Sequence, residues 1–392
     1  MEKNLTTGSV LKSILYFSLP YLLSYFLQTL YGMADLFIIG QFEDISSITA
    51  VSIGSQVMHM ITVMIVGLAM GATVNIGQAI GAGNKKKAAK DIGNTVTLFM
   101  MLAIAGAAGL LFFIKPIVGM MSTPQEAVHE TVIYLTICFL GIPFITAYNI
   151  ISSIFRGIGD SKSPMYFIAA ACAINIILDY LFIGGLHMGA AGAALGTTCS
   201  QTISVLIALV VIMKKKTGIA LSKNDFKIDR KTIKRLLKIG IPVALQDGFI
   251  QIAFIIITII ANRRGLDTAA AVGIVEKIIS FLFLVPSSML STVSALGAQN
   301  IGAGKRERAQ RILYYAVIIT VGFGVMISII IQFIAEPVVG LFTENAKVIL
   351  LGSQYIRGYI FDCIFAGVHF SFSGYFCACG HSEISFIDRK ST

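Results

Sequence analysis

Long apolar segments separated by short polar ones dominate the chain. Ten segments are apolar over about 20 residues or more, the length that an α-helix needs to cross the hydrocarbon core of a bilayer. They run over residues 13–40, 50–80, 92–114, 131–155, 165–184, 188–213, 239–262, 268–298, 311–335 and 350–378. The alternating apolar and polar residues of an outer-membrane strand are absent from the sequence. The pattern therefore predicts an all-α polytopic membrane protein.

The composition excludes the common soluble classes. The chain of 392 residues is 56% hydrophobic and 13% charged, whereas a soluble domain carries about 25% charged residues. A soluble enzyme, a disulfide scaffold and a coiled coil do not fit these values. The six cysteines lie almost entirely in apolar segments, so we interpret them as small core residues.

The basic residues predict the orientation. Of the 30 Lys and Arg residues, 24 lie at the two ends of the chain and in alternate loops, and only 4 lie in the loops between. Cytoplasmic loops are the ones enriched in Lys and Arg, so we expect both termini in the cytoplasm and the protein in the inner (plasma) membrane. The excess of basic charge then faces membrane lipid, and no nucleic-acid partner is expected.

The chain contains an internal repeat in which several motifs recur at one constant sequence offset. Residues 80–83 recur as 301–304, residues 115–119 resemble 336–340, and Gly159 matches Gly380. An even number of segments per repeat gives both halves the same orientation, which is typical of secondary transporters that hold substrate between two halves. The predicted organisation is a first lobe over 1–213, a basic linker over 214–238 and a second lobe over 239–392.

The first lobe has six segments and the second has four of an expected six. The missing counterparts would fall at about 386–405 and 409–434, and the chain turns charged at Asp388–Lys390 before it reaches Thr392. We therefore expect a twelve-helix architecture without its last pair, an irregular tail after about Gly380, and no competent antiport by the 392-residue form.

The order and spacing of several motifs resemble the multidrug and toxic compound extrusion (MATE) family over essentially the whole chain. The motifs are Leu19-Pro20, Gln28 through Asp35–Gly40, the two Ile-Gly-Ala-Gly loops, Phe155–Asp160, Asn175–Asp179 and Gly192–Thr197. The resemblance implies a V-shaped pair of six-helix lobes. It also implies alternating access and the export of small organic cations in exchange for Na+ or H+.

Four residues of the first lobe are candidates for the coupling-ion site. An ionisable residue at the centre of a span costs about 2.5–3.5 kcal/mol, so Asp35 and Asp179 are functional candidates by default. Asn175 lies four residues before Asp179 on the same helix face, and Thr197 is predicted at a similar depth. Two carboxylates, an amide and a hydroxyl suit Na+, and close carboxyl groups can also share a proton. In the resembled family the matching residues form the cation site, whereas the alternative is that Asp179 only forms hydrogen bonds within the bundle.

The second lobe does not repeat this site. The residues that match Asp35 there are Ile257 and Thr258, and Asp247, Glu276 and Asp362 remain as other intramembrane acids. Ion pairing or an interfacial position explains these acids as well as substrate binding does. Our candidates for the substrate cleft are Gln28, Tyr31, Tyr134, Glu276 and Asp362.

Pro20 and Pro242 are predicted in the first turns of their helices, where a proline is tolerated because its missing N–H has no partner. The resemblance implies instead that Pro20 is a hinge.

Two other functions stay open at this stage. A flippase for lipid-linked saccharides would want a cationic cleft, but the spans hold two basic residues, Lys277 and Arg357, against five acids. A non-functional truncated form is the other alternative. An enzyme is not expected, because neither Gly304-Lys305 nor Gly159-Asp160 lies in the setting that a phosphate-binding loop or a protease needs. We expect a monomer, no cofactor beyond the coupling ion, and a choice between Na+ and H+ that the sequence does not make.

Overall fold

The computed structural model describes residues 5–214 and 218–384, and its secondary structure in these ranges is helical. The helices of the first repeat are α1 (Val10–Phe42), α2 (Ile45–Gly81), α3 (Lys85–Phe112), α4 (Ile114–Met120), α5 (Gln125–Ile158), α6 (Lys162–Asp179), the π-helix η1 (Tyr180–Gly185) and α7 (Gly189–Lys214). The short 3-10 helix η2 (Lys223–Phe226) follows in the linker. The second repeat consists of α8 (Arg230–Arg263), α9 (Leu266–Leu282), α10 (Leu284–Gly302), α11 (Arg306–Gly340), α12 (Ala346–Tyr359) and α13 (Asp362–Cys379).

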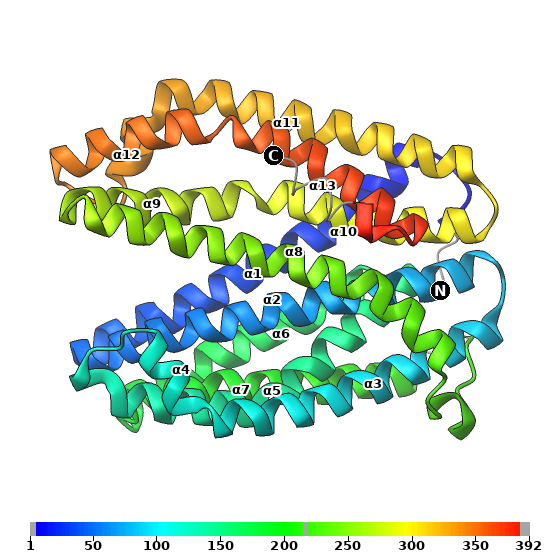
Figure 1. Ribbon diagram of the computed structural model, residues 1–392, viewed down its shortest axis with the longest axis horizontal. Helices are drawn as coiled ribbons and strands as arrows, with labels where there is room; N and C mark the ends of the chain where they lie inside the picture. Colours follow the sequence, from blue (N-terminus) through cyan, green and yellow to red (C-terminus); the bar gives the residue numbers. More distant parts are fainter. Residues whose placement is uncertain (1–4, 215–217, 385–392) are drawn as a thin grey trace.

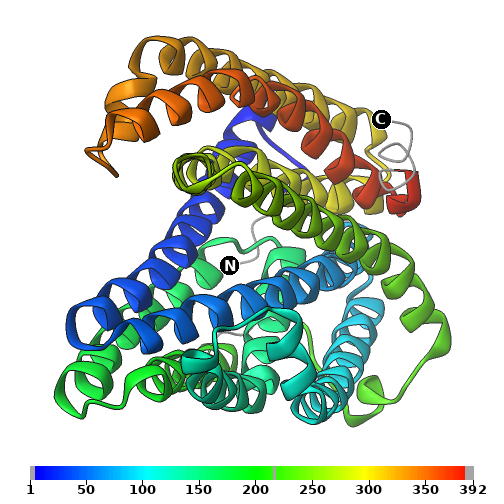
Figure 2. The same ribbon diagram turned by 60° about the vertical axis from the view of Figure 1, so that its left-hand side comes forward.

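The helices form two lobes that diverge towards one end of the molecule (Figures 1 and 2). We call α1–α7 the first lobe and α8–α13 the second lobe. Each has its own apolar core: one is built around Leu135, Cys138 and Phe139 of α5, the other around Val275 of α9 and Val339 of α11.

Nine helical stretches of the described residues are long and apolar enough to cross a membrane, with α6–η1 and α9–α10 each counted as one stretch. The pair α12 and α13, bent by 42°, makes a tenth span if it is counted as one. The ten apolar segments are therefore confirmed as helical, with three differences in detail. The segment 268–298 is two helices, α9 and α10, that meet at Phe283; the segment 350–378 is bent between Tyr359 and Asp362; and α4 follows α3 as a separate short helix.

Local capping explains several helix boundaries. The side chains of Ser9, Asp44 and Asn84 accept hydrogen bonds from backbone N–H groups in the first turns of α1, α2 and α3. These side chains satisfy amide groups that have no partner inside the helix. Polar residues that the hydropathy pattern assigned to loops are therefore helical, and most helices are longer than their apolar segments.

The repeat predicted from the sequence has a counterpart in the backbone. Gly83 and Gly304, which correspond in the repeat, have φ angles of 69° and 75°, and the corresponding pair Gly159 and Gly380 has φ angles of 101° and 81°. The Thr73 hydroxyl donates to the Ser153 carbonyl oxygen, and the Ser294 hydroxyl donates to that of Gly374, again at the same offset. Corresponding residues therefore occupy corresponding places in the two lobes.

The first helix of each repeat crosses towards the other lobe. Ile14, Phe17 and Tyr21 of α1 pack against α10 and α11, and α1 runs obliquely from one lobe to the other in Figure 1. Similarly, Leu236 of α8 packs against apolar residues of α2 and α3. The predicted division at residues 213 and 239 follows the repeat, whereas the packing ties the start of each repeat to the opposite lobe.

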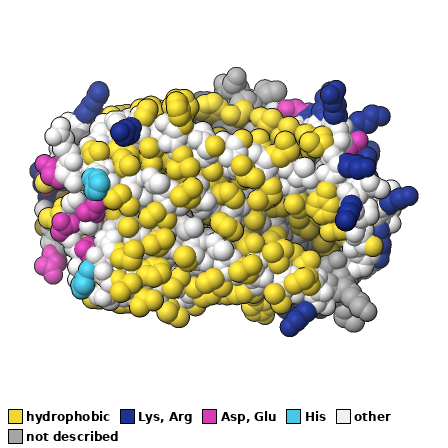
Figure 3. Space-filling view, turned by 90° about the horizontal axis from the view of Figure 1, so that it is seen from below, with side chains coloured by type: hydrophobic (Ala, Val, Ile, Leu, Met, Phe, Trp, Pro, Cys, Tyr) yellow, Lys and Arg dark blue, Asp and Glu magenta, His cyan; other side chains and the backbone are white. Residues whose placement is uncertain are grey.

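Charge separates along the long axis of the molecule. Figure 3 shows most of the visible Lys and Arg side chains at one end, acidic and histidine side chains at the other, and a broad apolar surface between them. We call the end that carries Lys85–Lys87 and Lys305–Arg308 the basic end. Its residues are those that the sequence places in the cytoplasm. The expectation of an irregular tail directly after Gly380 was wrong for its described part, because residues 382–384 are helical and the Ser382 hydroxyl donates to the Ile239 carbonyl oxygen at 3.0 Å. The charged segment Asp388–Lys390 lies outside the described residues.

Candidate cation-coupling site in the first lobe

Asp35 lies in the apolar interior of the first lobe. It is on α1, it is only 3% exposed, and its Oδ2 accepts a hydrogen bond of 3.2 Å from the Thr197 hydroxyl of α7. Its other carboxylate oxygen is buried and has no hydrogen-bond partner among the described residues. A buried carboxylate with one free oxygen is costly unless a proton or a cation completes its environment.

Asp179 and Asn175 meet Asp35 from α6. Both side chains are fully buried, and Asp35 interacts with both of them. Neither oxygen of Asp179 and neither amide atom of Asn175 has a hydrogen-bond partner outside this group among the residues described here. Three neighbouring side chains therefore present five buried polar atoms that no other described residue satisfies.

A change of helix type occurs at Asp179. The α-helix α6 ends at this residue and the π-helix η1 begins at Tyr180. π-helical segments are rare in proteins and are found frequently at functional sites. No feature of the hydropathy pattern indicated this break.

Small side chains of α7 make room for the site. A Cβ atom added to Gly196 would overlap Asp179 Oδ1, so any larger residue here would displace the Asp179 carboxyl group. One turn further on, the Ser200 hydroxyl donates to the Thr197 carbonyl oxygen at 2.9 Å. The spacing of Gly192, Gly196 and Ser200 is the sequence signal that could have pointed to this close packing.

Tyr31 supports the site from one turn before Asp35. Its hydroxyl lies 3.3 Å from the Thr197 carbonyl oxygen and 3.1 Å from the Ser200 hydroxyl. These contacts hold α1 against α7 at the level of the Asp35–Thr197 bond. Tyr31 was predicted to line the substrate cleft, and its observed hydrogen bonds are to the frame of the ion site.

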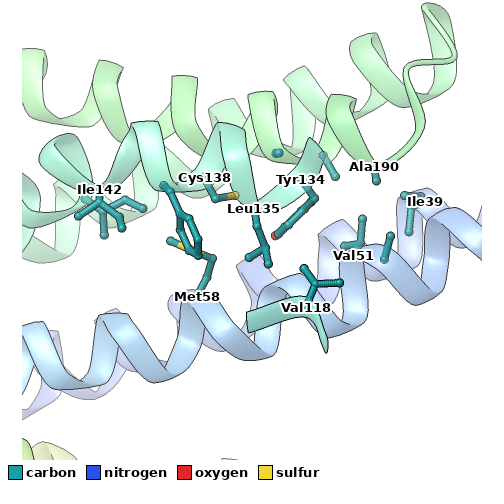
Figure 4. Packing of buried hydrophobic residues seen from close by; sticks show 14 of the residues in the cluster. Ile39, Val51, Met58, Val118, Tyr134, Leu135, Cys138, Ile142 and Ala190 are labelled. Atoms are coloured by element: carbon teal, nitrogen blue, oxygen red, sulfur yellow. The ribbon is translucent and has the colours of Figure 1, made fainter. Parts of the chain in front are cut away.

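The other cleft candidates occupy different environments. Gln28 is half-buried on α1. Tyr134 is 2% exposed and packs in the first-lobe core beside Val51, Leu135 and Val118 (Figure 4), with its hydroxyl 3.1 Å from that of Ser55. In this conformation Tyr134 is a core residue, and its part in substrate binding stays a prediction.

The acids of the second lobe do not form a matching cluster within the described residues. Glu276 of α9 accepts a hydrogen bond of 3.3 Å from Thr258 of α8, and Asp362 is exposed at the start of α13. Arg357, the basic residue nearest to Asp362 in the sequence, pairs with Glu336 at 3.2 Å. The roles of Glu276 and Asp362 in substrate binding stay predictions as well.

The expected position of the prolines was wrong. α1 begins at Val10 and α8 at Arg230, so Pro20 and Pro242 lie well inside their helices. The helices start earlier because polar and basic residues before the apolar segments are helical too. A proline inside a helix removes one backbone hydrogen bond, so both positions are local weak points. Next to one of them, the Ser24 hydroxyl donates to the Pro20 carbonyl oxygen at 2.8 Å.

Comparisons with known proteins agree with this fold. The MatE family model matches residues 20–181 and 242–387. The chain is 30% identical over 379 residues to a probable multidrug resistance protein, YpnP, of Bacillus subtilis (strain 168), which covers 96% of this chain and 84% of that protein. It is 26% identical over 375 residues to the multidrug export protein MepA of Staphylococcus aureus (strain MSSA476). This match covers 95% of this chain and 83% of MepA.

A solved structure shows the same arrangement of helices. It is described as the outward-facing conformation of a multidrug resistance MATE family transporter, and it matches with a TM-score of 0.91 at 24% identity over 98% of this chain and 86% of that one. The fold and the polar site in the first lobe define a multi-pass membrane transporter. The chain belongs to the MatE family of multidrug efflux transporters.

Proposed function

We propose that this protein is an antiporter that exports small organic cations by alternating access, driven by entry of Na+ or H+ at Asp35 and Asp179. The observation that carries the proposal is the group formed by the buried Asp35, Asp179 and Asn175 with the half-buried Thr197, drawn from α1, α6 and α7. Intramembrane acids of this kind mark ion pathways and proton relays.

The chemistry of the group suits a coupling ion rather than an organic substrate. Its carboxylate, amide and hydroxyl oxygens are hard ligands of the type that Na+ accepts, and its two carboxyl groups can hold a single proton between them. The four residues come from α1, α6 and α7, which all belong to the first lobe. A bound ion can therefore change the balance between conformations without competing for the same space as a drug.

The orientation supports export from the cytoplasm. The lobes join at the basic end and diverge at the other (Figure 2), and an excess of Lys and Arg marks the cytoplasmic side. A drug that enters between the lobes from the basic end would leave at the opposite end after the lobes change their tilt.

The test is the substitution Asp35→Asn in the intact chain. We expect loss of gradient-driven ethidium efflux, by at least about tenfold, because the amide neither exchanges a proton nor carries a charge for Na+. Efflux is measured in vesicles with an imposed Na+ gradient and, separately, an imposed pH gradient, which also identifies the coupling ion.

Asp44→Asn is the matched control. Asp44 caps α2 by accepting from the Ser47 backbone N–H at 3.0 Å, and asparagine caps equally well. This variant should export like the parent. Full efflux by Asp35→Asn at equal protein levels would remove Asp35 from the mechanism, and gradient-independent efflux by the parent would contradict antiport. Efflux by the unmutated chain is the first requirement of this proposal, which here departs from the expectation that the 392-residue form is not competent.

A further inference from the structure

Two glutamines join the lobes at the basic end. The Gln78 side chain of α2 donates to the Ala378 carbonyl oxygen of α13 at 2.8 Å, and the Gln299 side chain of α10 donates to the Gly157 carbonyl oxygen of α5 at 2.9 Å. The two donors correspond to each other in the repeat, and so do the two acceptors. The two bonds are therefore the same contact made twice, once in each direction between the lobes.

The acceptors are carbonyl groups that their own helices leave unpaired. At the end of α5 the N–H groups of Gly159 and Asp160 bond to Arg156 and Phe155, and those of Gly380 and His381 do the same for α13. This glycine-dependent cap pairs the carbonyl groups of the two residues before Gly157 and of the two residues before Ala378. It leaves the carbonyl groups of Gly157 and Ala378 themselves unpaired. Each carbonyl receives its hydrogen bond from the glutamine of the opposite lobe.

Glycines allow the backbones to come close enough for these bonds. A Cβ atom on Gly81 would overlap the backbone of Gln299, and one on Gly302 would overlap the backbone of Gln78. Gly77 of α2 and Ala298 of α10, which correspond in the repeat, also contact each other: a Cβ on Gly77 would lie 3.1 Å from that of Ala298. The contacts of α2 and α10 thus follow the symmetry of the repeat.

We infer that Gln78 and Gln299 form a latch that holds the lobes together at the basic end and that opens during the transport cycle. This inference rests on the proposed alternating access, which requires the two ends to open in turn. Each bond joins a glutamine amide of one lobe to a backbone carbonyl group of the other, so it exists only while the lobes are in contact. When the lobes separate, water replaces the bond at both groups. The latch therefore stabilises this conformation relative to one open at the basic end.

A native cysteine can report the opening. Cys377 precedes the acceptor Ala378, it is 0% exposed, and it packs with Met70 and Val74 of the opposite lobe. Separation of the lobes at the basic end would uncover its thiol. The experiment uses the intact chain with the other five cysteines replaced, and it measures the rate at which N-ethylmaleimide labels Cys377 in membranes without drug or ion gradient.

Gln78→Leu and Gln299→Leu should each raise the labelling rate about fivefold, because each removes one hydrogen bond of ordinary strength from the closed state only. The double variant should raise it about 25-fold if the two bonds are independent. Gln332→Leu is the matched control, since Gln332 donates to the Arg357 carbonyl oxygen at 3.1 Å within the second lobe. This control should leave the rate unchanged.

A second pair of variants tests the same contact without touching the glutamines. Gly81→Ala should also speed labelling because its methyl group overlaps the Gln299 backbone, whereas Gly106→Ala on α3 meets no atom within 4 Å and should not. Unchanged labelling in Gln78→Leu, Gln299→Leu and Gly81→Ala would overturn the latch, even if drug export is confirmed. Faster labelling in a protein that exports no drug would support the latch and contradict the proposed function.

Discussion

At the scale of single residues, the informative feature is the number of buried polar atoms without partners around Asp35. Protein interiors rarely leave such atoms unpaired, because each one costs about 1–3 kcal/mol. Asp179 and Asn175 together contribute four of them, packed against the bare backbone of Gly196. The arrangement lowers stability, and under the proposed function a proton or an ion bound there would offset this cost.

Residues that act as one site are expected to give non-additive effects. Asp179→Asn should reduce gradient-driven efflux as much as Asp35→Asn, at least about tenfold, and the double variant should be no worse than either. The measurement is ethidium efflux at matched protein levels. Two moderate defects that multiply in the double variant would show that the carboxyl groups act in separate steps.

At the scale of elements, the linker is anchored more firmly than its charge pattern suggests. η2 lies against α3, where the Asn94 side chain donates to the Asp225 carbonyl oxygen at 3.1 Å and Thr97 donates to that of Phe226 at 2.9 Å. The backbone N–H of Asp229 donates to Asn94 Oδ1 at 2.7 Å. The segment that was predicted only as a basic linker therefore ties the start of α8 to the first lobe.

Asp229 gives this anchor a pH dependence. Hydrogen bonds from the Thr232 hydroxyl and backbone N–H, followed by the Lys90 ammonium group, lower the pKa of Asp229 to about 2. A carboxyl group with a lowered pKa stabilises the folded linker above its unfolded pKa of about 3.9 and loses that contribution as the pH falls towards the folded value.

The expected result is a protection of the linker that disappears on acidification. Pepsin should cleave Asp229→Ala faster than the parent within the linker at pH 4, and the two rates should converge as the pH falls to about 2. Asp229→Asn, which retains a capping side chain, should lie between them. A difference between parent and alanine variant that persists unchanged at pH 2 would show that the charge of Asp229 does not stabilise the anchor.

At the scale of the whole molecule, packing divides the protein differently from the repeat. The beginning of α1 belongs to the core shared with α10 and α11, and the beginning of α8 belongs to the core shared with α2 and α3. Tyr21 illustrates the link, because the Arg156 guanidinium of the first lobe lies 4.1 Å from its ring centre. Any change of tilt between the lobes must bend or slide these two helices, each of which carries an internal proline.

Locking the lobes together should stop transport without unfolding either lobe. In a background without native cysteines, the pair Gly77→Cys and Ala298→Cys places two Cβ atoms about 3 Å apart across the lobes, and a small adjustment permits a disulfide. Oxidation should reduce efflux to background and a reductant should restore it.

The control for this lock is a disulfide inside one lobe. Gly367→Cys with Thr320→Cys joins α13 to α11, where a Cβ on Gly367 would lie 2.9 Å from that of Thr320. This pair should form a disulfide and keep transporting. Continued efflux with the Gly77–Ala298 disulfide fully formed would show that the lobes need not separate at the basic end.

The sequence alone determined the class, the number of apolar spans and the repeat. Bilayer thickness sets the length of each apolar segment, and the constant offset of the repeat survives as matched residues such as Gly159 and Gly380, whose backbone angles restrict them to glycine. It also indicated the members of the candidate ion site, since Asp35, Asn175, Asp179 and Thr197 are costly or polar residues at one predicted depth.

Only the tertiary structure decided which helices and side chains contact one another. The hydrophobic periodicity does not predict the π-helical turn after Asp179 or the close approach of Gly196 to that residue, because both depend on backbone geometry. It does not predict the interior position of Pro20 either, because α1 starts before its apolar segment. Gln78 and Gln299 resemble many polar residues near loops when read in sequence. The structure shows that each glutamine donates to a carbonyl oxygen at the end of a helix of the opposite lobe. The two helix ends correspond in the repeat, and each has one carbonyl group that its own helix does not pair.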